Sequence, residues 1–487
     1  MKSGINSKVM RLKKLLKQLP EIQVMGSREI EITGICSHSK AVRHGNLFVA
    51  KRGHVFDGAR YIPDAIASGA ACVLTETYDP TLRVTQLIHP KISEVEGKIA
   101  SSIFNEPSKK LFMVGITGTN GKTTTSYIVK QLLEQNRGPC GLIGTIEYLI
   151  GDKSFPPSHT TPDVSVCHKL LYEMVQQSCK SSVMEVTSHA LDQGRVAAIE
   201  YDAAIFTNLS QDHLDYHKTM DGYAAAKAKL FASLSSKACA IVNADDPYSS
   251  MMVENCKAKI VTYGVENNAD VRAENISLTA EGTSFTIIYQ GRSYPLEAPL
   301  AGRFNLYNIL AAAALALTHK IPIDLLRASK PPPGRMELVF NTKNKRVYID
   351  FAHTPDALEK ALVSLKDVTQ GRLFAVFGCG GDRDRLKRPS MARAAEKHAD
   401  FTIVTSDNPR SEDPELIISE IIRGFTNKNS YMIEPDRREA ITKAILMADQ
   451  DDCILVAGRG HEPYQILSHQ TVEFDDRNIT KEIINAL

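Results

Sequence analysis

Apolar runs separated by polar turns divide the chain into three blocks. The first block, residues 1–108, contains short strand-like runs such as 45–50 and 71–75 and ends in a proline-containing linker. Near its start, leucines recur at helical spacing over residues 12–19, next to several lysines. Because no long apolar stretch follows these lysines, the pattern predicts an amphipathic surface helix rather than a signal peptide.

The second block, residues 109–332, alternates between strand-like and helix-like patterns. It begins with the apolar run 111–116, a glycine-rich turn and a helical pattern. Further strands are predicted at 182–186, 203–209 and 238–243. This alternation predicts a parallel α/β sheet. Three consecutive prolines at 331–333 end the block, because proline cannot continue a helix.

The third block, residues 333–487, repeats the alternation more regularly. Strands are predicted at 347–351, 373–377, 401–406, 430–433 and 453–457. Helices are predicted at 356–365, 389–398, 416–425 and 438–448. The pattern is typical of a doubly wound, Rossmann-like domain. Its polar clusters all follow strands, at the edge where open α/β sheets bind ligands, so we expect this block to take part in the chemistry.

The composition narrows the class of protein. A chain of 487 residues, 43% hydrophobic and 23% charged, is expected to form several globular domains. The net charge of +2 gives no reason to expect nucleic-acid binding. The longest apolar run, 309–317, is much shorter than the ~20 residues of a membrane helix. Nine cysteines without a CxxC pair favour reduced thiols, as in a cytosolic protein. We predict a soluble, cytoplasmic protein, and we expect it to be a monomer.

A glycine-rich turn between a predicted strand and a predicted helix has the features of a phosphate-binding loop. Its glycines allow backbone N–H groups to surround phosphate oxygens, Lys122 can reach the outer phosphates, and the Thr123 hydroxyl can hold Mg²⁺. The usual spacing requires a glycine where Ile116 stands, yet the context disfavours the alternative, a glycine turn without a ligand. The predicted ATP-binding residues of the loop are Gly118, Thr119, Asn120, Gly121, Lys122, Thr123 and Thr124.

Segments in all three blocks resemble, in order, the motifs of the Mur ligase family, in the branch that adds a diamino acid. The phosphate loop alone is shared with the related folylpolyglutamate synthetases, whereas the ordered set is far more specific. The segments are 118–124, 160–162, 185–189, 208–215, 302–308, 333–337, 350–355, 378–384, 407–410 and 458–462.

The resemblance implies an ATP-dependent, amide-forming ligase of peptidoglycan synthesis and so a part in cell shape and division. ATP would phosphorylate a carboxylate of UDP-N-acetylmuramoyl-L-alanyl-D-glutamate, and the amine of meso-diaminopimelate would attack the acyl phosphate through a tetrahedral intermediate. ADP and phosphate would then leave. The resemblance also implies three α/β domains: a uridine-nucleotide-binding domain (1–108), a P-loop ATPase domain (109–332) and a Rossmann-like amino-acid-binding domain (333–487).

The resemblance also assigns roles in catalysis. Lys122, Glu185, His213 and Lys227 match catalytic residues, with Lys227 carbamylated and Thr123, Glu185, His213 and Lys227 as metal ligands. From the residues alone, Lys227 would be a helix-surface lysine, Glu185 equally a salt-bridge partner, and His213 a loop histidine.

Asn305, Arg335 and Asp350 match ATP contacts, which would require the third block to close over the second. Asn305 and Asn308 stand before an alanine-rich helix and could simply be N-terminal caps.

Two further groups match substrate-binding positions. Those for the UDP-linked dipeptide are Ser39, His54, Thr160, Thr161, Thr187, Gln193 and Arg195. The family's Asp-Ser-Arg signature around Ser39 is His-Ser-Lys here. Those for diaminopimelate are Arg383, Asp407, Asn408, Pro409, Arg410, Gly458 and Glu462. Diaminopimelate has a distal carboxylate that lysine lacks, and the guanidinium of Arg410 can hold it with two hydrogen bonds. The alternative is an Asx-Pro turn that merely ends in arginine.

Two rival functions share the phosphate loop. A folylpolyglutamate synthetase would use the same acyl-phosphate route, but the first block and residues 407–410 disfavour it. A P-loop switch or binding module would hydrolyse ATP without a muramoyl peptide or an amino acid. Product formation distinguishes these possibilities.

Overall fold

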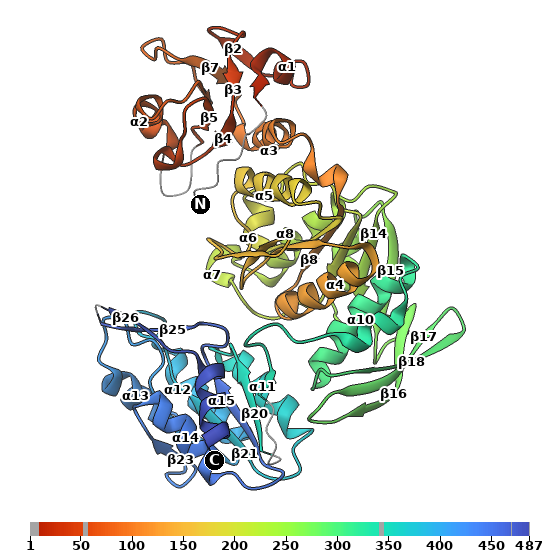
Figure 1. The fold of residues 1–487 in the computed structure, drawn as a ribbon, viewed down its shortest axis with the longest axis vertical. Coiled ribbons are helices and arrows are strands. Elements are labelled where there is room, and N and C mark those ends of the chain that lie inside the picture. Colours follow the sequence, from red (N-terminus) through yellow and green to blue (C-terminus); the bar gives the residue numbers. More distant parts are fainter. Residues whose placement is uncertain (1–8, 52–56, 340–344, 469, 487) are drawn as a thin grey trace. The chain divides into compact units, whose positions relative to one another are not determined.

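The computed structural model describes residues 9–51, 57–339, 345–468 and 470–486 (Figure 1). The chain forms two compact units, Met1–Tyr263 with Thr318–Ile321 and Gly264–Leu317 with Pro322–Leu487. Each unit contains parallel strands connected by helices, which is the α/β class predicted from the sequence. The predicted domain boundaries at 108/109 and 332/333 stay predictions.

The N-terminal part of the first unit is built on a five-stranded sheet. Its order is β2-β7-β6-β5-β4, and all neighbours except β2 and β7 run parallel. The strands are β2 Gln23–Met25, β4 Gly34–Cys36, β5 Asn46–Val49, β6 Cys72–Thr75 and β7 Thr85–Ile88. The helices are α1 Leu12–Leu16, α2 Ile62–Ala67 and α3 Ile92–Ile103. The predicted leucine helix is therefore present as α1, and its leucines pack into the core on one face of the sheet.

The central part of this unit carries the phosphate loop. Its strands are β8 Phe112–Thr117, β9 Cys140–Ile143, β10 Tyr148–Ile150, β11 Lys153–Phe155, β12 Ser181–Glu185, β13 Ala203–Phe206, β14 Cys239–Asn243 and β15 Lys259–Gly264. Their order is β11-β10-β9-β12-β8-β13-β14-β15, with a parallel core from β9 to β15. The helices are α4 Lys122–Arg137, α5 Val164–Gln176, α6 Ser188–Asp192, α7 Leu214–His217, α8 Met220–Ala232 and α9 Ser249–Val253. Strands β10 and β11 are antiparallel additions that the sequence pattern did not predict.

The second unit starts with three antiparallel strands that were also not predicted: β16 Val271–Leu278, β17 Thr283–Tyr289 and β18 Arg292–Ala298. Helix α10, Arg303–Thr318, follows them. Prediction from alternation failed here because these strands follow each other through short turns, without the intervening helices that mark parallel strands.

The C-terminal sheet has the order β19-β20-β24-β21-β22-β23 and is parallel except for β19. Its strands are β19 Glu337–Val339, β20 Arg346–Asp350, β21 Leu373–Phe377, β22 Phe401–Val404, β23 Tyr431–Ile433 and β24 Cys453–Ala457. One face packs against α11 Pro355–Lys366, α12 Lys387–His398 and α13 Pro414–Ile422. The other packs against α14 Arg437–Met447 and α15 Asp476–Ala486 (Figure 1). A hairpin, β25 Tyr464–Leu467 and β26 Gln470–Glu473, follows β24.

The C-terminal sheet brings the predicted polar clusters to one edge. Strands β20, β24, β21 and β22 are parallel neighbours, so the loops that follow them leave the sheet on the same side. The doubly wound arrangement predicted for the third block is thus confirmed.

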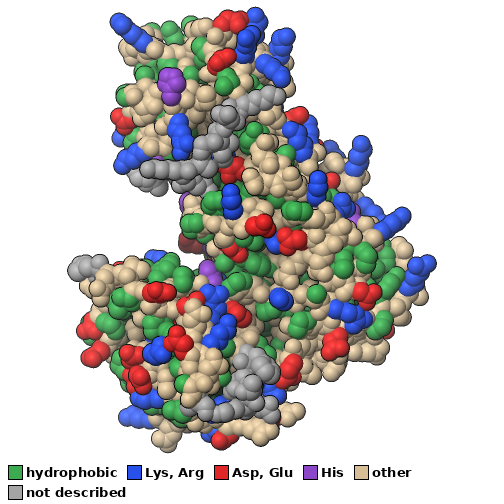
Figure 2. All heavy atoms as spheres, viewed as in Figure 1, with side chains coloured by type: hydrophobic (Ala, Val, Ile, Leu, Met, Phe, Trp, Pro, Cys, Tyr) green, Lys and Arg blue, Asp and Glu red, His purple; other side chains and the backbone are tan. Residues whose placement is uncertain are grey.

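The distribution of charged side chains and the length of the helices agree with the near-zero net charge and the short apolar runs of the sequence. On the face shown in Figure 2, basic and acidic side chains are interspersed. Among the described residues, every helix is too short or too polar to cross a bilayer. The predicted cytoplasmic location stays a prediction.

Candidate active site

The phosphate loop joins the end of β8 to the start of α4, as predicted. Gly118 and Gly121 have φ values of +151° and +82°, which glycine adopts without strain. A Cβ at Gly118 would lie 1.9 Å from the Thr207 Oγ1 atom, so no other residue fits there. The Lys122 ammonium donates to the carbonyl oxygens of Gly118 and Thr119, at 3.0 and 2.9 Å. The lysine that would bind phosphate is therefore held at the loop itself.

Glu185 is fully buried at the end of β12 and lies beside the loop. Its Oε2 atom accepts hydrogen bonds from the hydroxyls of Thr123 and Thr145, both at 2.9 Å. Its Oε1 atom accepts the Thr145 backbone N–H at 2.9 Å. Among the described residues Glu185 forms no ion pair, so these neutral donors hold a buried carboxylate whose charge lacks a cation. The alternative role of Glu185 as a salt-bridge partner is therefore wrong.

Thr145 was not predicted to take part in the site. It follows β9, the parallel neighbour of β12, and this places it beside the end of β12 where Glu185 stands. The sequence contains a signal for it, a Gly-Thr pair directly after a strand, but the signal is too common to be used alone. Only the order of the strands in the sheet, with β9 next to β12, shows that Thr145 lies beside Glu185.

Lys227 lies on α8 and is only 1% exposed, so its interpretation as a surface lysine is wrong. Its Nζ atom donates to the Gly118 carbonyl oxygen at 2.8 Å and lies 4.5 Å from the ring centre of Tyr223. Burial, and next the nearby Lys122 ammonium, hold the pKa of Lys227 well below its ordinary value. A neutral amine is the form that can react with carbon dioxide, so this environment suits carbamylation.

His213 is the N-cap of the short helix α7 and has a left-handed φ of +54°. Its ring lies 4.8 Å from the ring of His189 and 6.0 Å from that of Tyr223, measured between centres. The Tyr223 hydroxyl in turn lies 3.3 Å from the Thr119 Oγ1 atom of the phosphate loop. Tyr223 and His189 were not singled out by sequence, because an aromatic residue on a helix is usually a core residue.

The predicted metal ligands therefore form two separate groups next to the phosphate loop. Thr123 hydrogen-bonds Glu185, whereas Lys227 and His213 gather around Tyr223. Within the described ranges, no three or more His, Cys, Asp or Glu side chains form a metal cluster. The predicted set contains only two ligands of these types, so the assignment stays a prediction.

Four of the residues predicted to bind the dipeptide form one hydrogen-bonded group. Thr161 donates to the Glu185 carbonyl oxygen at 2.8 Å and to the Thr187 hydroxyl at 3.3 Å. The Arg195 guanidinium donates to Gln193 Oε1 through two nitrogens, at 3.0 and 2.7 Å, and to the Thr161 carbonyl oxygen at 3.0 Å. This places a guanidinium beside the strand end that carries Glu185.

The remaining dipeptide positions lie around or away from this group. The Thr160 hydroxyl lies 3.1 Å from that of Thr145 and so adjoins the group. Ser39 is buried in the N-terminal sheet domain, in the short 3₁₀ helix Ser39–Ala41. His54 lies outside the described residues. Their nucleotide contacts stay predictions.

Asn305, which is predicted to contact ATP, is buried in the second unit, and so is its neighbour Asn308. Asn305 and Asn308 lie within α10, which begins at Arg303, so they do not precede the helix as N-terminal caps. The Asn305 amide donates to the Ala301 carbonyl oxygen at 2.8 Å, because the side chain reaches back over the first turn.

Arg335 and Asp350 lie close to one another in this unit. The carboxylate of Asp350 accepts the backbone N–H groups of Met336 and Ala352, both at 2.8 Å. Burial raises the pKa of Asp350, and the positive charge of Arg335 opposes this. The Arg335 guanidinium lies 4.6 Å from the ring centre of Phe351.

The residues predicted to bind diaminopimelate gather where β21, β22 and β24 end. The Asn408 amide donates to Glu462 Oε2 at 3.0 Å, and a Cβ at Gly458 would lie 2.5 Å from Asp407 Oδ2. Burial, followed by the charge of Asp407, raises the pKa of Glu462. Two carboxylates thus share a partly enclosed site that a cation would stabilise.

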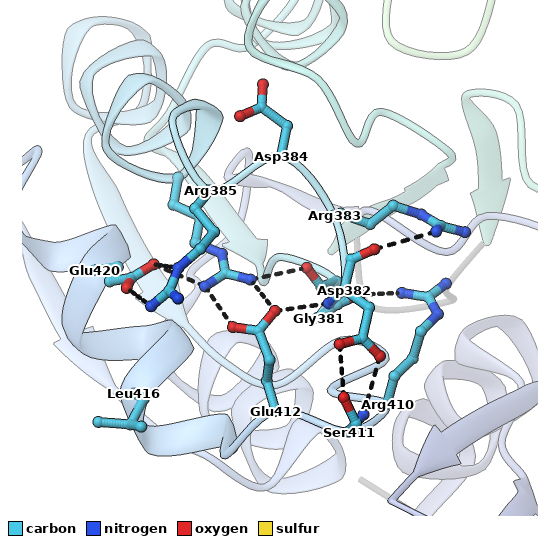
Figure 3. A network of polar contacts seen from close by, with 12 residues as sticks. Gly381, Asp382, Arg383, Asp384, Arg385, Arg410, Ser411, Glu412, Leu416 and Glu420 are labelled. Atoms are coloured by element: carbon cyan, nitrogen blue, oxygen red, sulfur yellow. Dashed lines mark hydrogen bonds and ion pairs between the residues drawn. The ribbon is translucent and has the colours of Figure 1, made fainter.

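Two arginines lie on the loops beside these carboxylates. The Arg410 Nη1 atom donates to the Gly381 carbonyl oxygen at 2.8 Å, and Arg383 Nη1 to that of Asp382 at 3.2 Å (Figure 3). The backbone of Pro409 fits against Gly381 so closely that a Cβ there would lie 1.9 Å from the Pro409 oxygen. The arrangement offers two cationic groups and two carboxylates along one sheet edge, which suits a zwitterionic ligand.

Comparison with known proteins shows which protein family the chain matches. Residues 31–107 match the model of the Mur ligase family catalytic domain, 116–316 that of the Mur ligase middle domain, and 334–460 that of the Mur ligase glutamate ligase domain. This chain belongs to the Mur ligase family.

Individual Mur ligases are similar to it over nearly their whole length. The UDP-N-acetylmuramoyl-L-alanyl-D-glutamate–2,6-diaminopimelate ligases of Chlamydia pneumoniae and Bacillus cereus are both 42% identical, and each alignment covers 98% of this chain and 99% of the relative. A solved structure of a ligase of the same name has a TM-score of 0.75 at 32% identity, covering 98% of this chain and 99% of that one. The three-domain α/β class predicted for this Mur ligase is confirmed.

Proposed function

We propose that this Mur ligase uses ATP to join meso-diaminopimelate to UDP-N-acetylmuramoyl-L-alanyl-D-glutamate, a step of peptidoglycan precursor synthesis. The observation that carries the proposal is that two arginines, Arg383 and Arg410, lie along the same sheet edge as two carboxylates, those of Asp407 and Glu462. Diaminopimelate carries two carboxylates and two ammonium groups, which these charges complement. The similarity to two ligases of this name over their full length supports the same substrates.

The activation step brings a carboxylate to a phosphate, and both are anions. Lys122 is assigned to neutralise the phosphates, since its ammonium already lies on the loop that would cradle them. A bound Mg²⁺ would add positive charge, and the oxygens of Thr123 and Glu185 would hold it. His213, in the group around Tyr223, would be a ligand of a second divalent ion. The uncompensated charge of the buried Glu185 carboxylate fits such a cation.

Lys227 is assigned as a carbamylated lysine. Its buried amine, neutral because its pKa is held low, would attack carbon dioxide and release one proton, which converts an uncharged neighbour of Lys122 into an anion. The carbamate would then offset the ammonium of Lys122 and support the metal.

The choice of amino acid is assigned to the C-terminal loops. Arg410 would hold the distal carboxylate by two hydrogen bonds, and Arg383 the proximal one. Glu462 and the Gly458 carbonyl would face an ammonium group. Lysine lacks the distal carboxylate, so it would leave Arg410 without an anionic partner.

The central test is product formation by the purified protein with ATP, Mg²⁺ and the UDP-linked dipeptide, offered diaminopimelate or lysine. We expect a diaminopimelate adduct by mass spectrometry, much less lysine adduct, and phosphate release only when both substrates are present. Sustained phosphate release without them would instead support a P-loop switch. Equal use of the two amino acids would overturn the specificity.

Two variants locate the chemistry. Lys122→Ala is expected to abolish ligation, whereas Lys130→Ala, on the same helix and paired with Glu134, is a matched control that should retain it. Arg410→Ala is expected to raise the KM for diaminopimelate strongly without increasing uncoupled ATP hydrolysis. Ligation at an undiminished rate by Lys122→Ala would overturn the proposed function.

A further inference from the structure

The two loops that carry Arg383 and Arg410 are joined to one another by hydrogen bonds. The Gly381 N–H donates to the Asn408 carbonyl oxygen at 2.9 Å. The Ser411 hydroxyl donates to Asp382 Oδ1 at 2.6 Å (Figure 3). Both guanidiniums therefore depend on the relative position of two irregular segments. The two positively charged guanidiniums repel each other, so a residue outside the loops is needed to keep the two loops at a fixed distance.

Arg388 supplies that support from α12. Its side chain is completely buried, so it cannot reach a ligand in solution. Its two terminal nitrogens donate to the two oxygens of Glu412, at 2.9 and 2.8 Å. One of them also donates to Glu420 Oε2 at 2.7 Å, and the other to the Gly380 carbonyl oxygen at 3.3 Å. One guanidinium thus contacts both loops and the helix α13.

Glu412 closes the connection between the loops. It follows Arg410 by two residues, and its Oε1 atom also accepts the Asp382 N–H at 2.6 Å, directly before Arg383 (Figure 3). Asp382 and Arg410 both have a φ of +53°, which non-glycine residues adopt only when the surroundings impose it. Hydrogen bonds from Arg388 and from the Asp382 amide hold the pKa of Glu412 below its ordinary value.

We propose that Arg388 and Glu412 are positioning residues that set the spacing of Arg383 and Arg410 and thereby the selection of diaminopimelate. This inference rests on the proposed function. The bidentate fork is essential because a lysine at 388 would keep the charge but could not bond both Glu412 oxygens and the Gly380 carbonyl. Without the Arg388 guanidinium, Glu412 would lose its ion pair, while Glu420 would keep only its pair with the more exposed Arg385. The second loop would then lose the connection that holds it to the first.

The test uses steady-state kinetics of Arg388→Lys and Glu412→Gln in the full-length protein. We expect the KM for diaminopimelate to rise roughly ten- to a hundredfold, as for other supporting residues behind a binding site, with kcat changed by less than about threefold. The KM values for ATP and for the UDP-linked dipeptide should not change. The preference for diaminopimelate over lysine should shrink, because only the former uses both arginines.

A matched control lies on the same helix. Arg393→Lys makes the same substitution at an exposed position, where the guanidinium donates to the Ser390 hydroxyl at 2.8 Å, and should leave all constants unchanged. The double variant Arg388→Lys/Glu412→Gln should lose less than the product of the two single losses, since the two residues act as a unit.

Several outcomes would overturn the proposal. A parallel rise of all three KM values would indicate a general structural role, and an unchanged KM for diaminopimelate would show that the pair positions nothing. If Arg388→Lys does not fold, Glu412→Gln decides alone, because its side chain is only partly buried and keeps its shape. Failure of the unaltered protein to ligate diaminopimelate would refute the proposed function instead, so the two failures are distinguishable.

Discussion

A buried ion pair between α14 and α15 allows a quantitative test. These two helices cover the face of the C-terminal sheet opposite to the face that packs against α12. Arg437 on α14 and Asp476 on α15 are both 0% exposed. Two hydrogen bonds join them, from Arg437 Nε at 2.8 Å and from Nη2 at 2.7 Å. The Nη2 atom also donates to the Ala457 carbonyl oxygen at 3.0 Å, at the end of β24. The pair therefore connects two helices to the strand that precedes Gly458.

The perturbation is Asp476→Asn, which keeps the shape of the side chain and removes its charge. A fully buried guanidinium would then lack its anion, which costs about 3–5 kcal/mol of unfolding free energy. The matched control is Glu482→Gln on the same helix, whose carboxylate pairs at 2.9 Å with Arg438, the next residue of α14. These side chains are 60% and 49% exposed, so the control should cost less than about 1 kcal/mol.

The assay is hydrogen exchange of the backbone amides of β24, Cys453–Ala457, followed by mass spectrometry. Exchange through opening of the C-terminal sheet reports its local unfolding free energy. Asp476→Asn is expected to reduce protection by roughly two to four powers of ten, since each 1.4 kcal/mol corresponds to about a factor of ten. A loss below tenfold, or an equal loss in Glu482→Gln, would refute the argument from burial.

Three further predictions concern the active site. Burial and the charge of Asp407 raise the pKa of Glu462, so its carboxylate ionises only above the usual pH range of a glutamate. The KM for diaminopimelate should therefore fall as the pH rises through this pKa. Glu462→Gln cannot ionise at this position and should flatten the dependence of KM on pH. Depletion of carbon dioxide should lower kcat reversibly, because Lys227 would lose its carbamate. Addition of ¹³C-bicarbonate should produce a carbamate signal in the NMR spectrum. A kcat that does not change with the bicarbonate concentration would contradict the assignment. Thr145→Val removes one donor from the buried Glu185 carboxylate, so it should slow ligation about tenfold and lower the melting temperature by a few degrees, measured by phosphate release and thermal unfolding.

Sequence reasoning found the five parallel strands of the C-terminal domain, β20 to β24, and the polar residues that follow them, but not β19, β25 or β26. This succeeded because alternation of strands and helices implies parallel strands, and the carboxyl ends of parallel strands meet at one edge. The polar clusters 407–410 and 458–462 could therefore be expected at one edge although they lie on different loops, whereas their roles toward diaminopimelate came from the resemblance. The same reasoning missed β16, β17 and β18, because short antiparallel connections leave no helical period between strands.

Residues whose role depends on burial could not be identified from the sequence. Lys227 has the sequence pattern of a solvent-exposed lysine, yet α8 packs it against Tyr223 and the Gly118 carbonyl. Arg388 is one of several basic residues in its stretch, and only packing shows that it contacts two loops. Asn305 stands before an alanine-rich run in sequence but inside the helix in space.

The sequence by itself determined the α/β class, the phosphate loop and the family motifs, because these depend on local periodicity and on short runs of residues. The tertiary structure alone decided which carboxylates are buried, which pKa values shift, and which charged side chains support others. Desolvation and Coulomb interactions depend on distances between segments that are far apart in the chain. A linear pattern contains no such distances, so the environment of Lys227 and the contacts of Arg388 became visible only in the folded protein.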